Sequence, residues 1–268
     1  MTETAEPERA PRSTHTLVIL SGIALLCIGL LLGLGAWQLN RLGWKLELIA
    51  QVNARVHAAA TPFPGPATWP EFNGDSDEYR HVSGAGQFLS EDESLVEAVT
   101  DNGPGYWVMT PFRTDQGFVV MVNRGFVPSD RRDAASRAGG NPTGAITVAG
   151  LLRVTEPGGG FLRSNDPAHD RWYSRDVAAI AAAHSLTNVA PYFVDADATP
   201  NPGGLPIGGL TVIDFPNNHL VYALTWFALA LMLAAASAFV ARNEWRVRHR
   251  FAVDETGSDA GPAGTTHA

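Results

Sequence analysis

The chain contains very little cysteine and no excess of basic charge. Cys27 is its single cysteine among 268 residues, which excludes an internal disulfide, a thiolate metal cluster and a C-x-x-C-H haem attachment site. Acidic residues outnumber basic ones, 27 to 19, for a formal net charge of -8. Because a phosphate-binding surface requires clustered basic residues, we expect no nucleic-acid partner.

The chain also lacks the common signatures of catalytic sites. No G-x-S-x-G, H-E-x-x-H or Walker loop occurs in it, and each of these motifs places a nucleophile, a metal or a phosphate at a defined spacing. We therefore expect that the protein is not an enzyme.

Two long segments lack Asp, Glu, Lys and Arg: residues 16–39 and residues 219–241. Each is long enough to cross a hydrocarbon core about 30 Å thick, which requires roughly 20 helical residues. We expect transmembrane helices at 16–39 and 217–241, with one domain at 40–216 between them. A cleaved signal peptide is the alternative for the first segment, but its apolar run exceeds the usual length of about 7–15 residues.

Arginines flank the two apolar segments on their outer sides. Arg9 and Arg12 precede the first segment, and four arginines follow the second, at positions 242, 246, 248 and 250. Short arginine-rich flanks remain cytoplasmic. We therefore expect cytoplasmic tails at 1–15 and 242–268, the latter with a disordered end, in a protein that crosses the bacterial plasma (inner) membrane twice. The domain at 40–216 then lies in the periplasm, or in the intermembrane space of a mitochondrion.

The domain between the segments has mainly the pattern of β-strands. β-branched and aromatic runs bounded by Gly, Pro and Asp predict strands at 81–88, 107–114, 117–127, 146–153, 192–196 and 210–215. Thr114–Gly117 predicts a hairpin turn. We expect residues 37–57 to continue the first helix, and residues 173–186 to form a helix with Ser174 as its N-cap. The fold class is thus two transmembrane helices flanking a β-rich (α+β) domain, barrel-like or sandwich-like.

An imidazole, His219, opens the second apolar segment. An ionisable group in a membrane helix is costly and indicates function. Helical spacing places His219, Tyr222, Ala223 and Trp226 on one face, and a neutral imidazole can ligate haem iron. The alternative is structural: His219 bonds to a carbonyl in a helix pair, and Tyr222 and Trp226 belong to an interfacial aromatic belt.

Three ordered motifs resemble a known family. They are Leu34–Gln38 with Arg41 and Lys45, then Met121–Pro128, and finally Pro206–Gly209 followed by Asn217–Phe227. Together they resemble the surfeit locus protein 1 family, called Shy in yeast, whose members are assembly factors of cytochrome c oxidase. The resemblance extends from about residue 30 to residue 245.

The resemblance implies a role in building subunit I of a haem-copper oxidase. Bacterial members bind haem a and pass it from the haem a synthase to the oxidase, and the family's haem-ligating histidine matches His219. We expect Tyr222 and Trp226 to flank the transiently bound macrocycle. Arg41 or Lys45 would pair with a haem propionate, or alternatively with lipid phosphate. A second copy of the chain could complete the site, and the client could oxidise cytochrome c or quinol. The rival functions are a membrane-anchored hydrolase and a ligand sensor.

Other polar positions are expected to be structural. Asn123-Arg124-Gly125 predicts a turn at a strand end with unusual backbone angles at the glycine, or alternatively a contact surface for the oxidase. Asp195 and Asp197 match no metal-binding spacing, so we assign them to surface loops.

Overall fold

The protein was analysed as a computed structural model, which describes residues 12–258, with side chains through Phe251. The chain divides into two compact units. One comprises the residues up to Glu47 and those from Phe215 onward, and the other comprises Leu48–Asp214.

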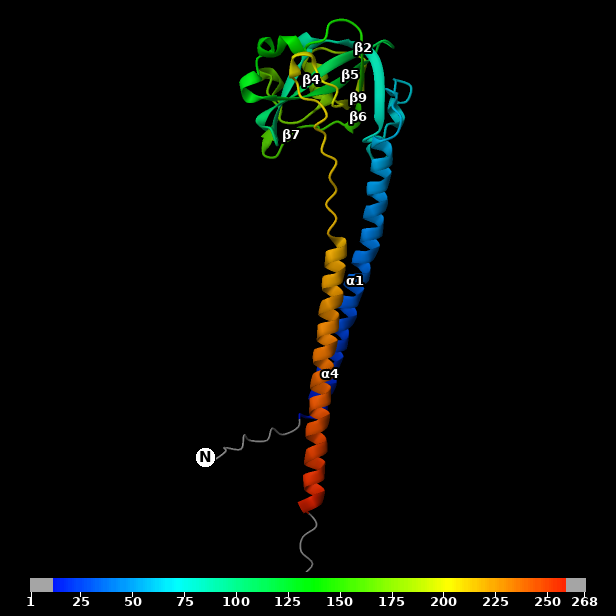
Figure 1. The fold of residues 1–268 in the computed structure, drawn as a ribbon, viewed down its shortest axis with the longest axis vertical. Coiled ribbons are helices and arrows are strands. Elements are labelled where there is room, and N and C mark those ends of the chain that lie inside the picture. Colours follow the sequence, from blue (N-terminus) through cyan, green and yellow to red (C-terminus); the bar gives the residue numbers. More distant parts are fainter. Residues whose placement is uncertain (1–11, 259–268) are drawn as a thin grey trace, which may run out of the picture. The chain divides into compact units, whose positions relative to one another are not determined.

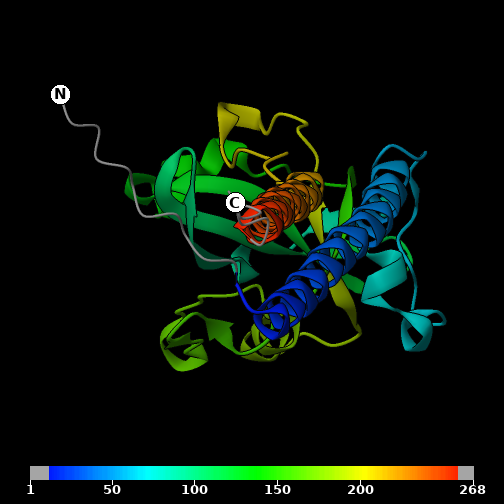
Figure 2. The same ribbon diagram turned by 90° about the horizontal axis from the view of Figure 1, so that it is seen from below.

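The first unit is built from two long helices, α1 (Thr14–Val56) and α4 (His219–Ser258). Both are long and apolar enough to cross a membrane. They are neighbours in both views and run antiparallel (Figures 1 and 2), with Gln38 against His219 near one end and Arg12 against Glu244 near the other. α1 continues unbroken through residues 37–57 as far as Val56, which confirms the predicted extension, and α4 continues past residue 241. The predicted disordered end beyond Ser258 lies outside the described residues.

A regular seam joins the two helices. The less exposed positions of α4 follow one another at intervals of four and three residues: His219, Ala223, Trp226, Ala230, Leu233 and Ser237. The less exposed positions of α1 include Ala24, Ile28, Leu31, Gly35, Gln38, Leu42 and Lys45, at the same intervals. This 3.5-residue period is that of left-handed helix pairs. Gly35 is part of the seam because any side chain there would meet the ring of Phe227.

The second unit is a closed, barrel-like sheet. Its five strands are β2 (His81–Phe88), β6 (Ile146–Val154), β9 (Val189–Ala196), β5 (Val119–Pro128) and β4 (Gly103–Thr114), in that order, and β4 pairs back with β2. The β5–β9 pair is parallel and the other four pairs are antiparallel. β1 (Thr61–Pro62) and β3 (Ser94–Thr100) extend the sheet, while β7 (Gly159–Gly160) and β8 (Arg163–Ser164) form a separate hairpin.

Short helical segments connect these strands. They are α2 (Gly74–Asp77) and α3 (Val177–Ala183), together with 3-10 turns at Trp69–Glu71, Ser90–Asp92, Ser129–Arg131, Ala134–Gly140, Pro167–His169 and Pro202–Gly204.

Strand periodicity separates two cores. Alternate residues of a strand point to opposite faces of its sheet, so Val120 and Val122 of β5 belong to the cluster inside the barrel, and Met121 to a cluster outside it. On β9, Val194 lies in the inner cluster and Phe193 in the outer one. α3 covers the outer cluster with Val177 and Ile180. The outer faces of β5 and β9 are therefore buried as well.

The barrel confirms the first of the two predicted architectures, and five of the predicted strands are present. The predicted hairpin turn also forms: Gly117 has a φ of 87° and donates its N–H to the carbonyl of Thr114. The prediction of a strand at 210–215 was wrong, since this segment pairs with no strand. Thr211 of this segment contacts Asp195 of β9, and both edges of β9 are already occupied by β5 and β6.

Two further predictions require correction. The helix predicted at 173–186 is shorter, and its N-cap is Asp176, whose carboxylate accepts the N–H of Ala179. Ser174 instead donates its hydroxyl to the carbonyl of Glu156. β3 was missed because Ser94–Thr100 contains Leu, Glu and Ala, which favour helices, whereas pairing with β4 holds it as a strand.

Candidate functional site

The imidazole of His219 is held by Gln38. Its Nδ1 lies 2.8 Å from Oε1 of Gln38, on the facing helix. An amide oxygen can only accept a hydrogen bond, so Nδ1 carries the proton and Nε2 of a neutral imidazole keeps its lone pair. Histidines that bind metals use this arrangement, in which the second ring nitrogen donates to a carbonyl or carboxylate. The contact therefore leaves Nε2 suited to an axial bond to iron.

The predicted stripe around His219 divides between two sides of α4. Ala223 is buried and Trp226 is partly buried on the seam side, with His219. Tyr222 is 54% exposed, and its side chain lies away from the seam. A residue three positions along a helix is offset by about 60°, which accounts for the difference. Trp226 thus lies on the seam side of α4 with His219, whereas Tyr222 lies toward its exposed surface.

Arg41 and Lys45 also have different surroundings. Arg41 is exposed, and its guanidinium lies 4.3 Å from the centre of the Trp44 ring. Lys45 lies two turns beyond Gln38 on the seam, with its ammonium 5.2 Å from the centre of the Phe215 ring. Neither cation makes an ion pair within the described part of the chain, so each is free to meet an anionic group.

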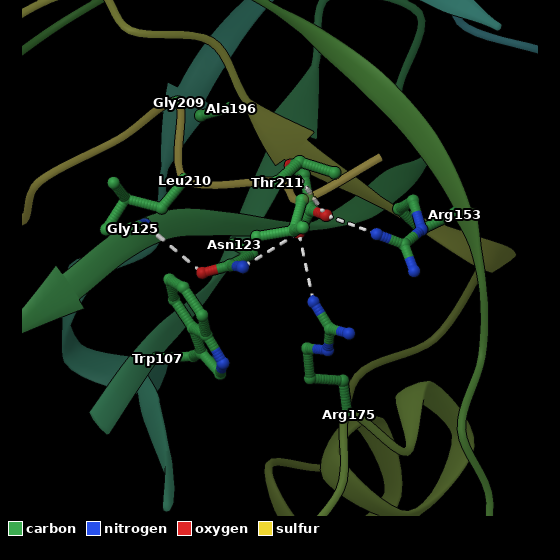
Figure 3. A pocket seen from close by; sticks show the side chains of 11 residues that line it. Trp107, Asn123, Gly125, Arg153, Arg175, Ala196, Gly209, Leu210 and Thr211 are labelled. Atoms are coloured by element: carbon green, nitrogen blue, oxygen red, sulfur yellow. Dashed lines mark hydrogen bonds and ion pairs between the residues drawn. The ribbon is translucent and has the colours of Figure 1, made fainter. Parts of the chain in front are cut away.

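The barrel has a polar hollow of its own on the outer side of β5, β6 and β9. This cavity of about 210 Å³ is lined by Trp107, Asn123, Arg153, Arg175, Asp195 and the segment Gly209–Val212. The β5–β9 register places Asn123 opposite Asp195. Figure 3 shows Asn123, Arg153 and Arg175 converging from three different elements.

The carboxylate of Asp195 is the centre of this hollow. It is 4% exposed, so the assignment of this residue to a surface loop was wrong. One oxygen accepts from Asn123 at 2.7 Å and from Arg175 at 3.3 Å. The other accepts from Arg153 at 2.9 Å and from the hydroxyl of Thr211 at 3.0 Å. A buried carboxylate requires such partners, and here they join three strands to the segment that precedes α4.

Two outer carboxylates balance the two arginines. Glu78 accepts from Nε of Arg153 at 3.1 Å, and Glu156 accepts from Nε of Arg175 at 3.1 Å. Burial lowers the pKa of Arg153, but the nearby negative charge of Asp195, with smaller contributions from Tyr79 and Glu78, outweighs burial and the net pKa is raised. Burial likewise raises the pKa of Glu156, but hydrogen bonds from Arg175 reverse the shift, and its net pKa is lowered. The cluster is thus internally paired and acts as a structural clamp.

The central and C-terminal motifs meet beside this clamp. Phe126 and Ile207 exchange both backbone hydrogen bonds, each 2.9 Å long. Gly125 has a φ of 126°, and a Cβ atom there would collide with the carbonyl of Ile207. Asn123-Arg124-Gly125 therefore lies within β5 and not in a turn at its end, although the unusual glycine angle is confirmed. The two motifs adjoin because the chain backbones approach closely here.

Arg124 clamps loops from the other side of β5. It is 1% exposed and donates to the side chains of Asn141 and Asn201 and to the carbonyl of Gly140. Burial lowers its pKa to about 10; the nearby charge of Glu93 acts to raise the pKa, and that of Arg137 lowers it further. Its partners indicate a structural role.

The sequence analysis assigned no role in a site to Gln38, Arg153, Arg175 or Thr211. Gln38 could have been found as a neutral amide near the end of an apolar run. Asp195 could have been found as a carboxylate within a β-branched strand. Within residues 12–251 no three His, Cys, Asp or Glu side chains gather as a metal site.

The fold and these sites define a β-barrel protein flanked by two potential membrane helices, with a histidine at the start of the second. Residues 25–231 match the SURF1 family, and the chain belongs to it. It is 37% identical to Surfeit locus protein 1 of Mus musculus over 213 residues, 74% of this chain and 67% of the mouse protein. It is 36% identical to the protein of that name from Homo sapiens, over 74% of this chain and 69% of the human protein. A SURF1-like protein of Monosiga brevicollis is 35% identical, over 79% of this chain and 83% of that protein.

Proposed function

We propose that this protein holds haem a on His219 and assists its insertion into subunit I of a haem-copper oxidase. The observation that carries the proposal is the bond from Nδ1 of His219 to Gln38, which leaves Nε2 of the neutral ring with a free lone pair. Membership of the SURF1 family supports it, because the resemblance of the sequence motifs to oxidase assembly factors points to the same histidine.

The setting of this proposal is the bacterial plasma (inner) membrane. In this arrangement α1 and α4 cross the bilayer, the barrel lies in the periplasm and both termini are cytoplasmic. His219 is the first residue of α4, so it would lie near the periplasmic face. Haem a could reach this level of the bilayer directly from a haem a synthase.

Different residues of this chain would then have different roles in holding the macrocycle. Gln38 fixes the tautomer and the ring orientation of His219. Trp226 and Tyr222 offer aromatic surfaces near the histidine, and Arg41 or Lys45 neutralises a propionate. A single axial ligand binds haem less firmly than two, and weaker holding suits release to the oxidase.

An absorption spectrum tests the proposal. The full chain is produced together with haem a synthesis enzymes, purified in mild detergent and examined for a haem band. We expect bound haem a in the wild-type protein and its loss in His219→Ala. His57→Ala is the matched control, because His57 is an exposed histidine at the end of α1. A colourless wild-type preparation, or equal haem content in His219→Ala and the control, would contradict haem binding at His219.

A further inference from the structure

The end of the helix pair opposite His219 contains an open groove. It has a volume of about 500 Å³, within the range of ligand pockets. Its walls are apolar or small side chains of both helices, among them Leu17, Leu20 and Ala24 of α1 and Leu233, Ala236 and Val240 of α4. The groove forms because alanine and serine stand here where larger residues would fill the seam.

The length of the groove along α4 is close to the thickness of the hydrocarbon layer of one bilayer leaflet. Along α4 it extends from Leu233 to Glu244 and Arg248. At about 1.5 Å per helical residue, the eleven residues from Leu233 to Glu244 rise by about 16 Å. The hydrocarbon core is about 30 Å thick, so this is roughly half of it. An acyl chain of one leaflet therefore matches the groove in length and polarity.

The charged side chains that line the groove, among the residues that the structure describes, lie at its mouth. Arg12 contacts Glu244 through its backbone N–H at 3.2 Å and its Nε at 3.4 Å. Arg248 donates to the carbonyl of Arg12 at 2.8 Å and to the hydroxyl of Thr14 at 3.3 Å. The side chain of Glu244 is 6% exposed, whereas that of Arg12 is 40% exposed. Among residues 12–251, the mouth therefore holds two guanidinium groups, of Arg12 and Arg248, beside the buried carboxylate of Glu244.

The guanidinium of Arg12 is positioned to accept an outside anion. Neither of its Nη atoms makes a hydrogen bond within the described part of the chain, and Nε of Arg248 is buried without a partner. Trp245 also lines the mouth, and tryptophan favours the level of the lipid headgroups. Arg242 and Arg246 are exposed nearby on α4 and add positive charge. These features together complement a phosphate above an apolar chain.

We propose that this groove is a binding site for one anionic phospholipid, with an acyl chain between α1 and α4 and the phosphate on Arg12. The site requires the helix pair to lie in a membrane, as in the proposed function, but it is independent of haem. A protein helix would fill the apolar groove equally well, but it would not supply the anion at the mouth.

Native mass spectrometry of the full chain in detergent tests this site. Phosphatidylglycerol and phosphatidylcholine with identical acyl chains are titrated separately, and glycerol phosphate is the competitor that lacks chains. We expect one phosphatidylglycerol to be retained in preference to phosphatidylcholine, with no displacement by glycerol phosphate. Arg12→Gln should weaken phosphatidylglycerol retention roughly fivefold, the expected effect of one basic residue near an anionic lipid. Arg250→Gln is the matched control, because Arg250 is exposed and does not line the groove.

A second variant tests the groove without changing charge. Ala236→Leu adds volume to one wall and should reduce retention of both lipids, while the protein remains folded by circular dichroism. Equal retention of the two lipids, or equal effects of Arg12→Gln and Arg250→Gln, would overturn the proposal. Displacement by glycerol phosphate would also overturn it, because the ligand would then be a free phosphate. A homodimer that excludes lipid would assign the groove to a second copy. Haem content reports separately on His219.

Discussion

The imidazole of His219 donates its Nδ1 proton to the side-chain oxygen of Gln38 across 2.8 Å. This bond joins α1 to α4, and it also joins the first sequence motif, which contains Gln38, to the third, which contains His219. Because the bond determines which ring nitrogen carries the proton, it turns an ordinary helix contact into a chemical constraint on the histidine. Gln38 is therefore the residue through which the helix pair controls its candidate ligand.

Replacing Gln38 tests that control. In Gln38→Leu the side chain keeps a similar volume but cannot accept the Nδ1 proton, so the ring can change tautomer and orientation. We expect haem affinity to fall by about 10–100-fold, the usual effect of losing such a partner. Titration of the purified chain with haem, followed by absorbance, measures this effect.

The control for Gln38 is Asn40→Leu, which also replaces an amide by leucine on α1 but at an exposed position. Its haem affinity should match that of the wild type. If Gln38→Leu and Asn40→Leu bind haem equally well, Gln38 has no positioning role.

The Asp195 carboxylate should be important for the stability of the barrel. Asp195→Asn removes the charge that faces Arg153 and Arg175, and it presents an amide N–H₂ where hydrogen bonds were accepted. Breaking a buried ion pair by removing one partner costs about 3–5 kcal/mol. We expect a loss near the lower value, about 3 kcal/mol, because Glu78 and Glu156 still pair with the arginines.

Denaturant unfolding followed by tryptophan fluorescence measures the effect of Asp195→Asn. Asp101→Asn makes the same chemical change on an exposed turn and should leave the free energy of unfolding within about 0.5 kcal/mol of the wild type. Similar values for the two variants would show that the Asp195 cluster is not a clamp.

Gly125 should not tolerate a side chain. Its φ of 126° disfavours other residues, and a Cβ atom would collide with the carbonyl of Ile207. We expect Gly125→Ala to destabilise the barrel by more than about 1 kcal/mol. Gly139→Ala is the matched control, because a Cβ atom there meets no heavy atom within 4 Å. Thermal unfolding compares the two variants, and equal midpoints would contradict the close approach of the two motifs.

Acidification should weaken the barrel through Glu156. Its pKa in the folded protein lies below the ordinary 4.5. As the pH falls through this range, the unfolded chain binds a proton before the folded one does, so stability is present above pH 4.5 and decreases below it. In Glu156→Gln this decrease should be smaller. Unfolding midpoints from pH 6 down to about pH 3.5 measure it.

The comparison for Glu156→Gln is Glu91→Gln, an exposed glutamate in a 3-10 turn. It should retain the pH dependence of the wild type. A wild-type slope in Glu156→Gln would show that the ion pair with Arg175 does not contribute to acid sensitivity.

Local sequence patterns were sufficient for much of the architecture. The charge-free runs determined both long helices, since no other structure satisfies the backbone of so many apolar residues in a row. Alternating β-branched and aromatic residues located β2, β5 and β6 within two residues of their observed bounds. The segment at 210–215 has the same composition as these strands but is unpaired, because pairing depends on a free neighbouring strand edge and composition does not reveal one.

The candidate site, like the architecture, could be predicted only in part from the sequence. The sequence by itself determined that an imidazole opens the second apolar helix and that three motifs occur in order. Only the tertiary structure decided that Gln38 meets His219 and that Asn123, Arg153, Arg175 and Thr211 share the carboxylate of Asp195. Helix pairing and strand register bring these atoms together across as many as 181 positions in the chain. Local periodicity determines which face a residue occupies, but contacts over such separations arise only when the elements pack.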